Sequence, residues 1–189
     1  MLFLEEHTMV MIRAARVDEF ARLTEIELDA FMVWAKACGV TSQPYASPEF
    51  VLQRSFDQDL LLVAATDATG HIAGFAAGDA VGDYLYIVEI DVERAAQGKG
   101  IGRALMFAML GKARDAGQKY AVLTTDRFAP FNAPFYTKLG FRILEKWETP
   151  PFLQERLDRQ IADGLDAARR VAMHLDLRSA VSSTFEATH

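Results

Sequence analysis

A glycine-rich segment in the middle of the chain has the residue types and spacing of an anion-binding loop. It reads Gln97-Gly98-Lys99-Gly100-Ile101-Gly102-Arg103 and lies between a predicted strand and a predicted helix. The first turn of a helix leaves about four N–H groups without an intrahelical acceptor. The helix dipole favours an anion there, and glycines let a phosphate approach the backbone. The segment therefore predicts a bound phosphate or pyrophosphate, and the alternative is a glycine turn beside a solvated basic helix face.

The charge balance also favours a bound polyanion. The whole chain has 20 Lys and Arg against 26 Asp and Glu, a formal net charge of −6. Residues 93–119, by contrast, contain six bases and two acids. Dedicated nucleic-acid binders usually carry a basic face, whereas this chain as a whole is acidic. We therefore expect a small anionic ligand at the basic segment and no nucleic acid.

Two nucleotide-binding motifs do not fit this loop. A P-loop requires Gly-Lys-Ser/Thr, but Lys99 is followed by Gly100. A dinucleotide fingerprint requires a small residue where Arg103 stands, and it belongs in a leading βαβ unit. A nucleotide-binding regulator is therefore disfavoured.

Two motifs together resemble the GNAT superfamily of N-acetyltransferases. Gln97, Gly100 and Gly102 are similar to its pyrophosphate loop, Gln-x-x-Gly-x-Gly. The second motif is Asn132-Ala133-Pro134-Phe135-Tyr136-Thr137-Lys138-Leu139-Gly140-Phe141, which contains the Phe-Tyr-x-x-Leu-Gly-Phe core of the superfamily's last shared helix and strand. The resemblance extends from about residue 12 to residue 177 and is strongest over 84–146. The second motif and residues 164–173 resemble a bacterial subgroup.

This resemblance implies a GNAT-like α/β fold, with a mixed, mostly antiparallel sheet flanked by helices. It also implies an N-acetyltransferase that moves an acetyl group from acetyl-CoA to a primary amine of a small molecule. The pantetheine arm is expected to lie along a strand edge like an added strand. The expected CoA contacts are Ile90, Asp91, Val92, Gln97, Gly98, Lys99, Gly100, Ile101, Gly102, Arg103, Asn132 and Phe135.

Two positions depart from the superfamily pattern. Arg94 stands where many members have proline, which we expect to loosen the turn. Ala129 stands where many members have asparagine, seven residues before the tyrosine, and Asn132 is the nearest asparagine.

Acyl transfer to an amine requires a base and an acid. An alkyl ammonium, with a pKa of about 10.4, must lose a proton before it attacks. Glu89 is the candidate base, and the alternative is a solvated strand face or an ion pair with Arg94 or Arg103. Tyr136 is the candidate acid for the departing thiolate, and the alternative is a core aromatic. The N–H of Val92 is the expected donor to the carbonyl oxygen.

Neighbouring side chains define the expected surroundings of these groups. Strand alternation puts Glu89 and Asp91 on one face, where like charge and desolvation would raise one pKa. The aromatic residues available for an acceptor pocket suggest an acceptor with an apolar part; they are Phe31, Trp34, Tyr45, Phe50, Tyr84 and Tyr86.

Hydrophobic periodicity and turn residues predict the elements that position the site. The expected strands cover residues 10–14, 60–66, 72–78, 84–92, 120–124, 141–146 and 169–177. The expected helices cover 17–38, 49–57, 101–116, 130–138 and 152–162. A hairpin turn is expected at Asp67-Ala68-Thr69-Gly70. We expect one domain over residues 9–178, with flexible tails at 1–8 and 179–189.

Other features of the composition bear on the cellular compartment, on metal binding and on the expected partners. The single Cys38 cannot form an intramolecular disulfide, so we expect a buried thiol in a cytoplasmic protein. The four histidines lack metal-ligand spacing, no signal peptide is evident and no apolar run is long enough to span a membrane. The expected partners are acetyl-CoA or CoA and an amine acceptor, and a homodimer is left open. The alternatives to small-molecule acetylation are protein acetylation, at lysine or the N-terminus, and a non-catalytic acyl-CoA sensor.

Overall fold

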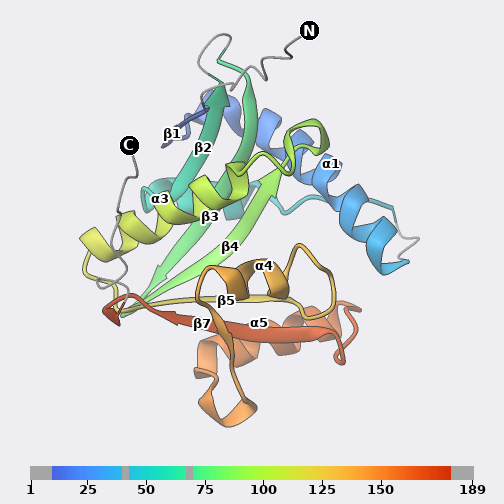
Figure 1. Cartoon of the computed structure of the whole chain (residues 1–189), viewed down its shortest axis with the longest axis vertical. Helices are drawn as coiled ribbons and strands as arrows, with labels where there is room; N and C mark the ends of the chain where they lie inside the picture. Colours follow the sequence, from blue (N-terminus) through green and yellow to red (C-terminus); the bar gives the residue numbers. More distant parts are fainter. Residues whose placement is uncertain (1–9, 40–42, 67–69, 180–189) are drawn as a thin grey trace, which may run out of the picture. The chain divides into compact units, whose positions relative to one another are not determined.

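The computed structural model describes residues 10–39, 43–66 and 70–179 (Figure 1). Seven strands form one sheet in the order β1-β2-β3-β4-β5-β7-β6. The pairs β1–β2, β2–β3, β5–β7 and β6–β7 are antiparallel, whereas β4 and β5 are parallel. This confirms the expected mixed, mostly antiparallel sheet. The strands are β1 Val10–Ala14, β2 Leu61–Thr66, β3 Ile72–Val81, β4 Tyr84–Val92, β5 Tyr120–Asp126, β6 Arg142–Ile143 and β7 Arg170–Asp176.

Five α-helices and three short 3₁₀ turns flank or connect these strands in the described part of the chain. The helices are α1 Phe20–Cys38, α2 Glu49–Asp57, α3 Ile101–Asp115, α4 Ala133–Lys138 and α5 Pro151–Ala162. The 3₁₀ turns are η1 Val17–Glu19, η2 Arg94–Ala96 and η3 Lys146–Glu148. Gly39 ends α1 in the left-handed region, as its position after the helix predicts.

The chain divides into two compact units, and the first contains the residues up to Gly78 together with Glu89–Met109. Helix α1 buries Leu23 and Ile26 in this unit. Gly74 on β3 lies so close to the end of β4 that an added Cβ would come within 2.8 Å of the Asp91 carbonyl oxygen. Only glycine fits there without a shift, so the backbone of β3 closely supports the segment of β4 that carries the candidate base.

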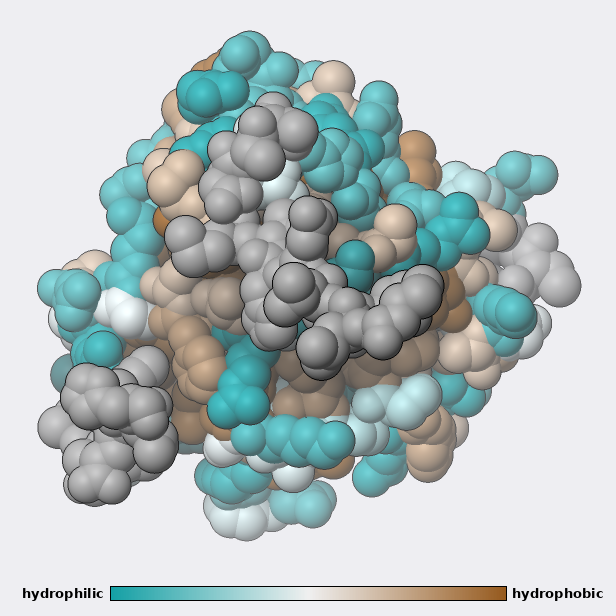
Figure 2. All heavy atoms as spheres, turned by 45° about the horizontal axis from the view of Figure 1, so that its top comes forward, coloured by the Kyte–Doolittle hydropathy of each residue, from teal (hydrophilic) through white to brown (hydrophobic). Residues whose placement is uncertain are grey.

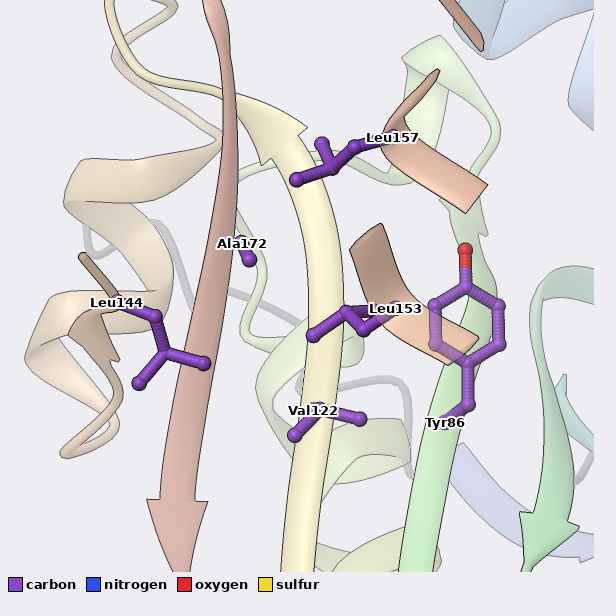
Figure 3. Close-up of a cluster of buried hydrophobic side chains, with 6 residues drawn as sticks. All are labelled: Tyr86, Val122, Leu144, Leu153, Leu157 and Ala172. Atoms are coloured by element: carbon purple, nitrogen blue, oxygen red, sulfur yellow. The ribbon is translucent and has the colours of Figure 1, made fainter. Parts of the chain in front are cut away.

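The second unit contains Asp79–Val88 and the residues from Leu110 onward. Its core forms where the apolar side of α5 packs on three strands, as Figure 3 shows. The cluster consists of Tyr86, Val122, Leu144, Leu153, Leu157 and Ala172. The parallel ladder between β4 and β5 contains three pairs, from Tyr84↔Tyr120 to Tyr86↔Val122, although β4 continues to Val92.

Several predicted boundaries are wrong, each for a local reason. The strand expected over 141–146 stops at Ile143, because the Glu148 carboxylate accepts the N–H of Glu145 and starts a 3₁₀ turn. The helix expected from Pro130 begins at Ala133, because the Asp126 carboxylate holds the preceding backbone in a turn. Strand β3 continues three residues past Gly78, to Val81.

Most large apolar side chains are buried, but a few are exposed. Tyr45, Phe50, Phe128 and Trp147 are each more than half exposed. On the face drawn in Figure 2, hydrophobic residues gather toward the middle and hydrophilic residues surround them.

Cys38 is half-buried rather than buried as expected. Within residues 10–39, 43–66 and 70–179, no helix combines the length and apolar character needed to cross a membrane.

The terminal segments and the hairpin tip lie largely outside the described residues. Residues 1–8 and 180–189 of the expected flexible tails at 1–8 and 179–189, and residues 67–69 of the expected hairpin turn, belong to this part of the sequence. The expectation of one domain over residues 9–178 stays a prediction.

Candidate functional site

The glycine-rich loop has an open backbone at the start of α3. Gly98 and Gly100 adopt positive φ values of 76° and 81°, and no atom lies within 4 Å of a Cβ placed on either residue. The carbonyl of Gly100 accepts the N–H of Ala104 at 3.0 Å, so the helix starts directly after the second glycine. The loop therefore presents an accessible helix N-terminus, the geometry that an anion requires.

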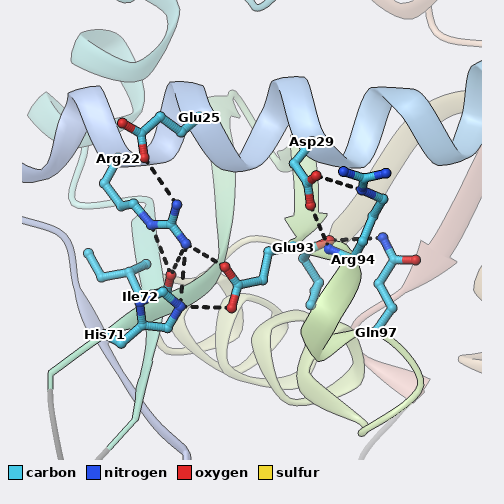
Figure 4. Close-up of polar contacts among 9 residues, drawn as sticks. Arg22, Glu25, Asp29, His71, Ile72, Glu93, Arg94 and Gln97 are labelled. Atoms are coloured by element: carbon cyan, nitrogen blue, oxygen red, sulfur yellow. Dashed lines mark hydrogen bonds and ion pairs between the residues drawn. The ribbon is translucent and has the colours of Figure 1, made fainter.

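Contacts to helix α1 hold the segment that precedes this loop (Figure 4). The Arg22 guanidinium forms an ion pair with Glu93, and the other oxygen of that carboxylate lies 2.7 Å from Nε2 of His71. Two helical turns along α1, Asp29 contacts Arg94. These contacts fasten the end of β4 and turn η2 to α1 on both sides of the Glu93–Arg94 peptide.

Arg94 is held through both its backbone and its side chain. Its N–H donates to Oδ2 of Asp29 at 2.7 Å, and its Nε donates to Oδ1 at 2.6 Å. The backbone hydrogen bond is the largest cause of a lowered pKa of Asp29. Proline could make neither contact, so this departure from the superfamily pattern introduces a fastening where the sequence predicted only a looser turn.

The remaining polar side chains of the loop have different roles. The Gln97 amide donates to the carbonyl oxygen of Val92 at 2.9 Å and so closes the loop on the end of β4. Lys99 is exposed, and Arg103 lies 5.2 Å from the centre of the Phe107 ring. Neither Lys99 nor Arg103 forms an ion pair within the described residues, so both cations are available to a phosphate.

The candidate base lies in a group of acids and one serine. Glu89 accepts a long hydrogen bond of 3.4 Å from the Ser47 hydroxyl, and the Ser47 N–H donates to Glu27 at 2.7 Å. Burial, together with the charge of Glu27, raises the pKa of Asp91 to about 8. The two arginines proposed as alternative ion-pair partners of Glu89 are placed elsewhere, with Arg94 on Asp29 and Arg103 over Phe107.

Sequence reasoning did not single out Glu27 or Asp29 on α1, or Ser47. One signal was available for Glu27, because it follows Leu23 by four residues and therefore lies on the buried stripe of the helix. A charged residue on that stripe needs an explanation. Asp29 and Ser47 left no such local signal, because their partners are far along the chain.

The second motif lies on α4 and the residues just before it. Tyr136 is half-buried, with its ring 5.2 Å from that of Phe135 and 5.9 Å from that of Phe141. Asn132 is the N-cap residue of α4, and its carbonyl accepts the N–H of Tyr136 at 3.0 Å. The Ala129 N–H donates to Asp126 at 3.0 Å. This packing fits both the acid and the aromatic-core interpretation of Tyr136.

The aromatic residues proposed for an acceptor pocket separate into two groups. The Phe31 ring lies 5.5 Å from Trp34 and 5.4 Å from Tyr45, which forms an aromatic cluster in the first unit. Tyr84 instead packs on Phe152, and Tyr86 is buried under α5 with Arg156 over its ring. Tyr86 is therefore not available to an acceptor, because it is buried under α5, whereas Tyr84 stays partly exposed and lines a groove of the second unit.

No group of three or more metal-ligating side chains occurs in the part of the chain that the structure describes.

A shallow groove of about 560 Å³ lies in the second unit beside the exposed Trp147, bordered by Pro150 and Pro151. The acids along it are in ion pairs, Asp83 with Lys119 and Glu148 with Arg142.

Known structures share this fold. N-acetylglutamate synthase from Neisseria gonorrhoeae, complexed with coenzyme A and N-acetyl-glutamate, aligns with a TM-score of 0.65 and 19% identity over 91% of this chain. The aligned part is only 36% of that synthase chain. The ribosomal-protein-S18-alanine N-acetyltransferase from Escherichia coli aligns with a TM-score of 0.61 and 19% identity, over 96% of this chain and 99% of its own.

A third structure has slightly higher identity. A GNAT family acetyltransferase from Brucella melitensis, in complex with acetyl-CoA, is 25% identical and has a TM-score of 0.55, over 72% of this chain and 84% of its own. The model of the acetyltransferase (GNAT) family matches residues 20–141, which is more than half of the sequence. This chain therefore belongs to the GNAT acetyltransferase family, whose members are acyl-CoA-dependent N-acyltransferases.

Proposed function

We propose that this protein transfers the acetyl group of acetyl-CoA to the primary amine of a small molecule. The observation that carries the proposal is the open, positive-φ glycine loop at the start of α3, fastened to α1 by two ion pairs. Complexes of fold neighbours with CoA or acetyl-CoA support the choice of ligand.

The CoA site is proposed to follow β4 and the loop. The backbone N–H groups at the start of α3 bind the pyrophosphate, with Lys99 and Arg103 as exposed cations beside it. The pantetheine arm pairs with Ile90–Val92 as an added strand. This role is supported by the β4–β5 ladder, which ends at Tyr86 and does not extend to that part of β4.

The chemistry follows from the groups on β4 and α4. Glu89 takes a proton from the acceptor ammonium, directly or through water, and the amine nitrogen then attacks the thioester carbon. The N–H of Val92 stabilises the oxygen as negative charge develops on it. The C–S bond breaks, the Tyr136 hydroxyl donates a proton to the thiolate, and the nitrogen releases its second proton to water as the neutral amide forms. Full transfer of the proton from the Tyr136 phenol to the thiolate is uphill by about 2 kcal/mol at unperturbed pKa values. A strong hydrogen bond from the hydroxyl to the thiolate is therefore enough to stabilise the leaving group.

The test is an acceptor screen that measures CoA thiol release from acetyl-CoA. The panel contains alkyl amines, amino acids, aminoglycosides and peptides with free N-termini or lysines. Turnover with small amines supports the proposal, whereas turnover restricted to peptides would identify a protein acetyltransferase. Tight CoA binding by calorimetry without turnover on any acceptor would identify a sensor instead. Tyr136→Phe keeps the ring but lacks the hydroxyl, so it separates the proposed acid from a packing role.

A further inference from the structure

Two carboxyl groups of the first unit are buried without a cation. Glu27 on α1 is only 9% exposed, and its Oε2 has no hydrogen-bond partner among the described residues. Oδ2 of Asp91 on β4 is likewise buried and has no partner there. Two arginines of this unit pair with other acids, Arg22 with Glu93 and Arg94 with Asp29. Both orphan oxygens therefore need a hydrogen-bond donor.

One proton satisfies both requirements. A protonated carboxyl donates an O–H, so a carboxyl and a carboxylate that share a proton supply each other with the missing contact. Burial raises the pKa of both residues, and the charge of Glu27 raises that of Asp91 further. Like charges close together in a desolvated site cannot both stay ionised at neutral pH.

Ser47 connects this pair to the candidate base. Its N–H donates to Oε1 of Glu27, and its hydroxyl donates to Oε1 of Glu89. Ser47 also opposes the effect of burial on Glu27, because its hydrogen bonds lower the pKa of that residue. The serine therefore contacts Glu27 on one side and Glu89 on the other.

We propose that Glu27 and Asp91 share one proton at neutral pH and, through Ser47, fix the position of the Glu89 carboxylate. They are then positioning residues for the base of the proposed function, and this part of the inference rests on that function. The shared proton limits the pair to one negative charge, so Glu89 faces one neighbouring charge instead of two.

Other titratable groups around the pair are few. On β4 the nearest along the chain is Glu89, and Glu93 directly after the strand is compensated by Arg22. The part of β3 that supports Asp91, residues 72–78, contains no titratable side chain. The segment before α2 contributes Tyr45, whose ring packs on Phe31. Glu27 is therefore the group whose charge acts most on Asp91.

Protonation of the pair is tested without any turnover. Infrared spectra at neutral pH should show a protonated carboxyl band in the wild type that is absent in Asp91→Asn. The folded state binds the extra proton between about pH 4 and 8, so the melting temperature of the wild type should fall relative to Asp91→Asn as pH rises through that window. The exposed Asp57→Asn is the matched control and should change neither measurement.

The pair is refuted if the wild type and Asp91→Asn give the same carboxyl band and parallel melting curves against pH. Should Asp91→Asn fail to fold, Glu27→Gln provides the same comparison. Removing the neighbouring charge should then shift the Asp91 ionisation to lower pH, and an unshifted ionisation would equally refute the pair.

Positioning is tested with Ser47→Ala, which keeps the N–H on Glu27 and removes the hydroxyl that contacts Glu89 and Glu27. We expect kcat to fall about tenfold with the KM for acetyl-CoA unchanged, while the infrared band is retained, because losing a hydroxyl that lowers the pKa of Glu27 favours the protonated pair. Unchanged kcat would overturn the positioning role and leave the shared proton intact. If no acceptor is turned over by the wild type, the proposed function fails, and the infrared result still decides the pair.

Discussion

Glu27 and Asp29 lie two residues apart on α1, yet their carboxylates are in opposite electrostatic situations. Asp29 accepts two hydrogen bonds from Arg94, and its pKa is lowered. Glu27 has no cation among the residues that the structure describes, and burial raises its pKa. Residues two apart point to different sides of a helix, about 200° around its axis. One helix thus presents a compensated acid to Arg94, just before the glycine-rich loop, and an uncompensated acid to Asp91.

The difference separates two uses of a charge. A carboxylate that is paired with a cation contributes geometry, and it keeps its charge across the physiological pH range. A carboxylate buried without a cation contributes a proton-binding site, and its effect changes with pH. Variants on the Asp29 side should therefore alter CoA affinity, whereas variants on the Glu27 side should alter pH dependence.

The largest effect is expected on the cofactor side, from Gly100→Val. A β-branched residue is strained at a φ of 81° and would fill the open space in front of the loop. CoA affinity measured by calorimetry should fall about 100-fold, which corresponds to roughly 2.7 kcal/mol. Gly111→Ala is the control, because its added Cβ meets nothing within 4 Å in α3. Equal CoA affinity of Gly100→Val and wild type would remove the loop from the site.

Glu89→Gln should have the next largest effect, and it should appear in the chemistry. The amide cannot take a proton from the ammonium, so we expect kcat/KM to fall about 100-fold, within the range for general base catalysis. The wild-type inflection below the pKa of the free amine should disappear from the pH profile, while CoA affinity stays the same.

Asp91→Asn is measured beside Glu89→Gln, because coupled carboxyls share their apparent ionisations. If the inflection in the pH profile persists in Glu89→Gln but disappears in Asp91→Asn, Asp91 is the base. The contrast between the Asp29 side and the Glu27 side of α1 would then no longer separate cofactor binding from pH dependence.

Asp29→Asn should have a moderate effect. Asparagine still accepts the N–H of Arg94 but loses the charge that pairs with its guanidinium, so the loop keeps part of its fastening. We expect CoA affinity to fall about threefold, and the loss should shrink as salt is added. The exposed Asp18→Asn should bind CoA like the wild type. An altered pH profile with normal CoA affinity in Asp29→Asn would contradict the comparison.

Lys99→Ala should have the smallest effect. Lys99 is exposed and has no ion pair within the described residues, so its attraction to a phosphate is screened within about 10 Å at 0.1 M salt. We expect a loss of about twofold in CoA affinity at low salt that disappears at high salt. A loss as large as that of Gly100→Val would mean that charge rather than backbone geometry holds the anion.

Much of the fold was predictable because its signals are local. Strand β4 and helix α2 occupy the predicted residues, and the loop begins α3 as its glycines predict. Strand β6 was predicted too long, because its end depends on the Glu145–Glu148 contact rather than on hydrophobicity. The contact of Arg94 with Asp29 joins residues 65 positions apart. No local pattern reveals such a pair, and the same limit applies to Glu27 and Asp91.

The fastening of Arg94 has a consequence for how the family tolerates substitution. A relative with proline at this position has no N–H and no guanidinium to offer, so an acid at the position of Asp29 gains nothing there. The two positions should therefore change together among relatives, acid with arginine and other residues with proline. In this chain, Arg94→Pro alone would leave the Asp29 carboxylate without its donors, and Asp29→Ala in the same protein should recover part of that loss. We therefore expect proline, which many relatives have at this position, to impair this chain unless Asp29 is replaced as well.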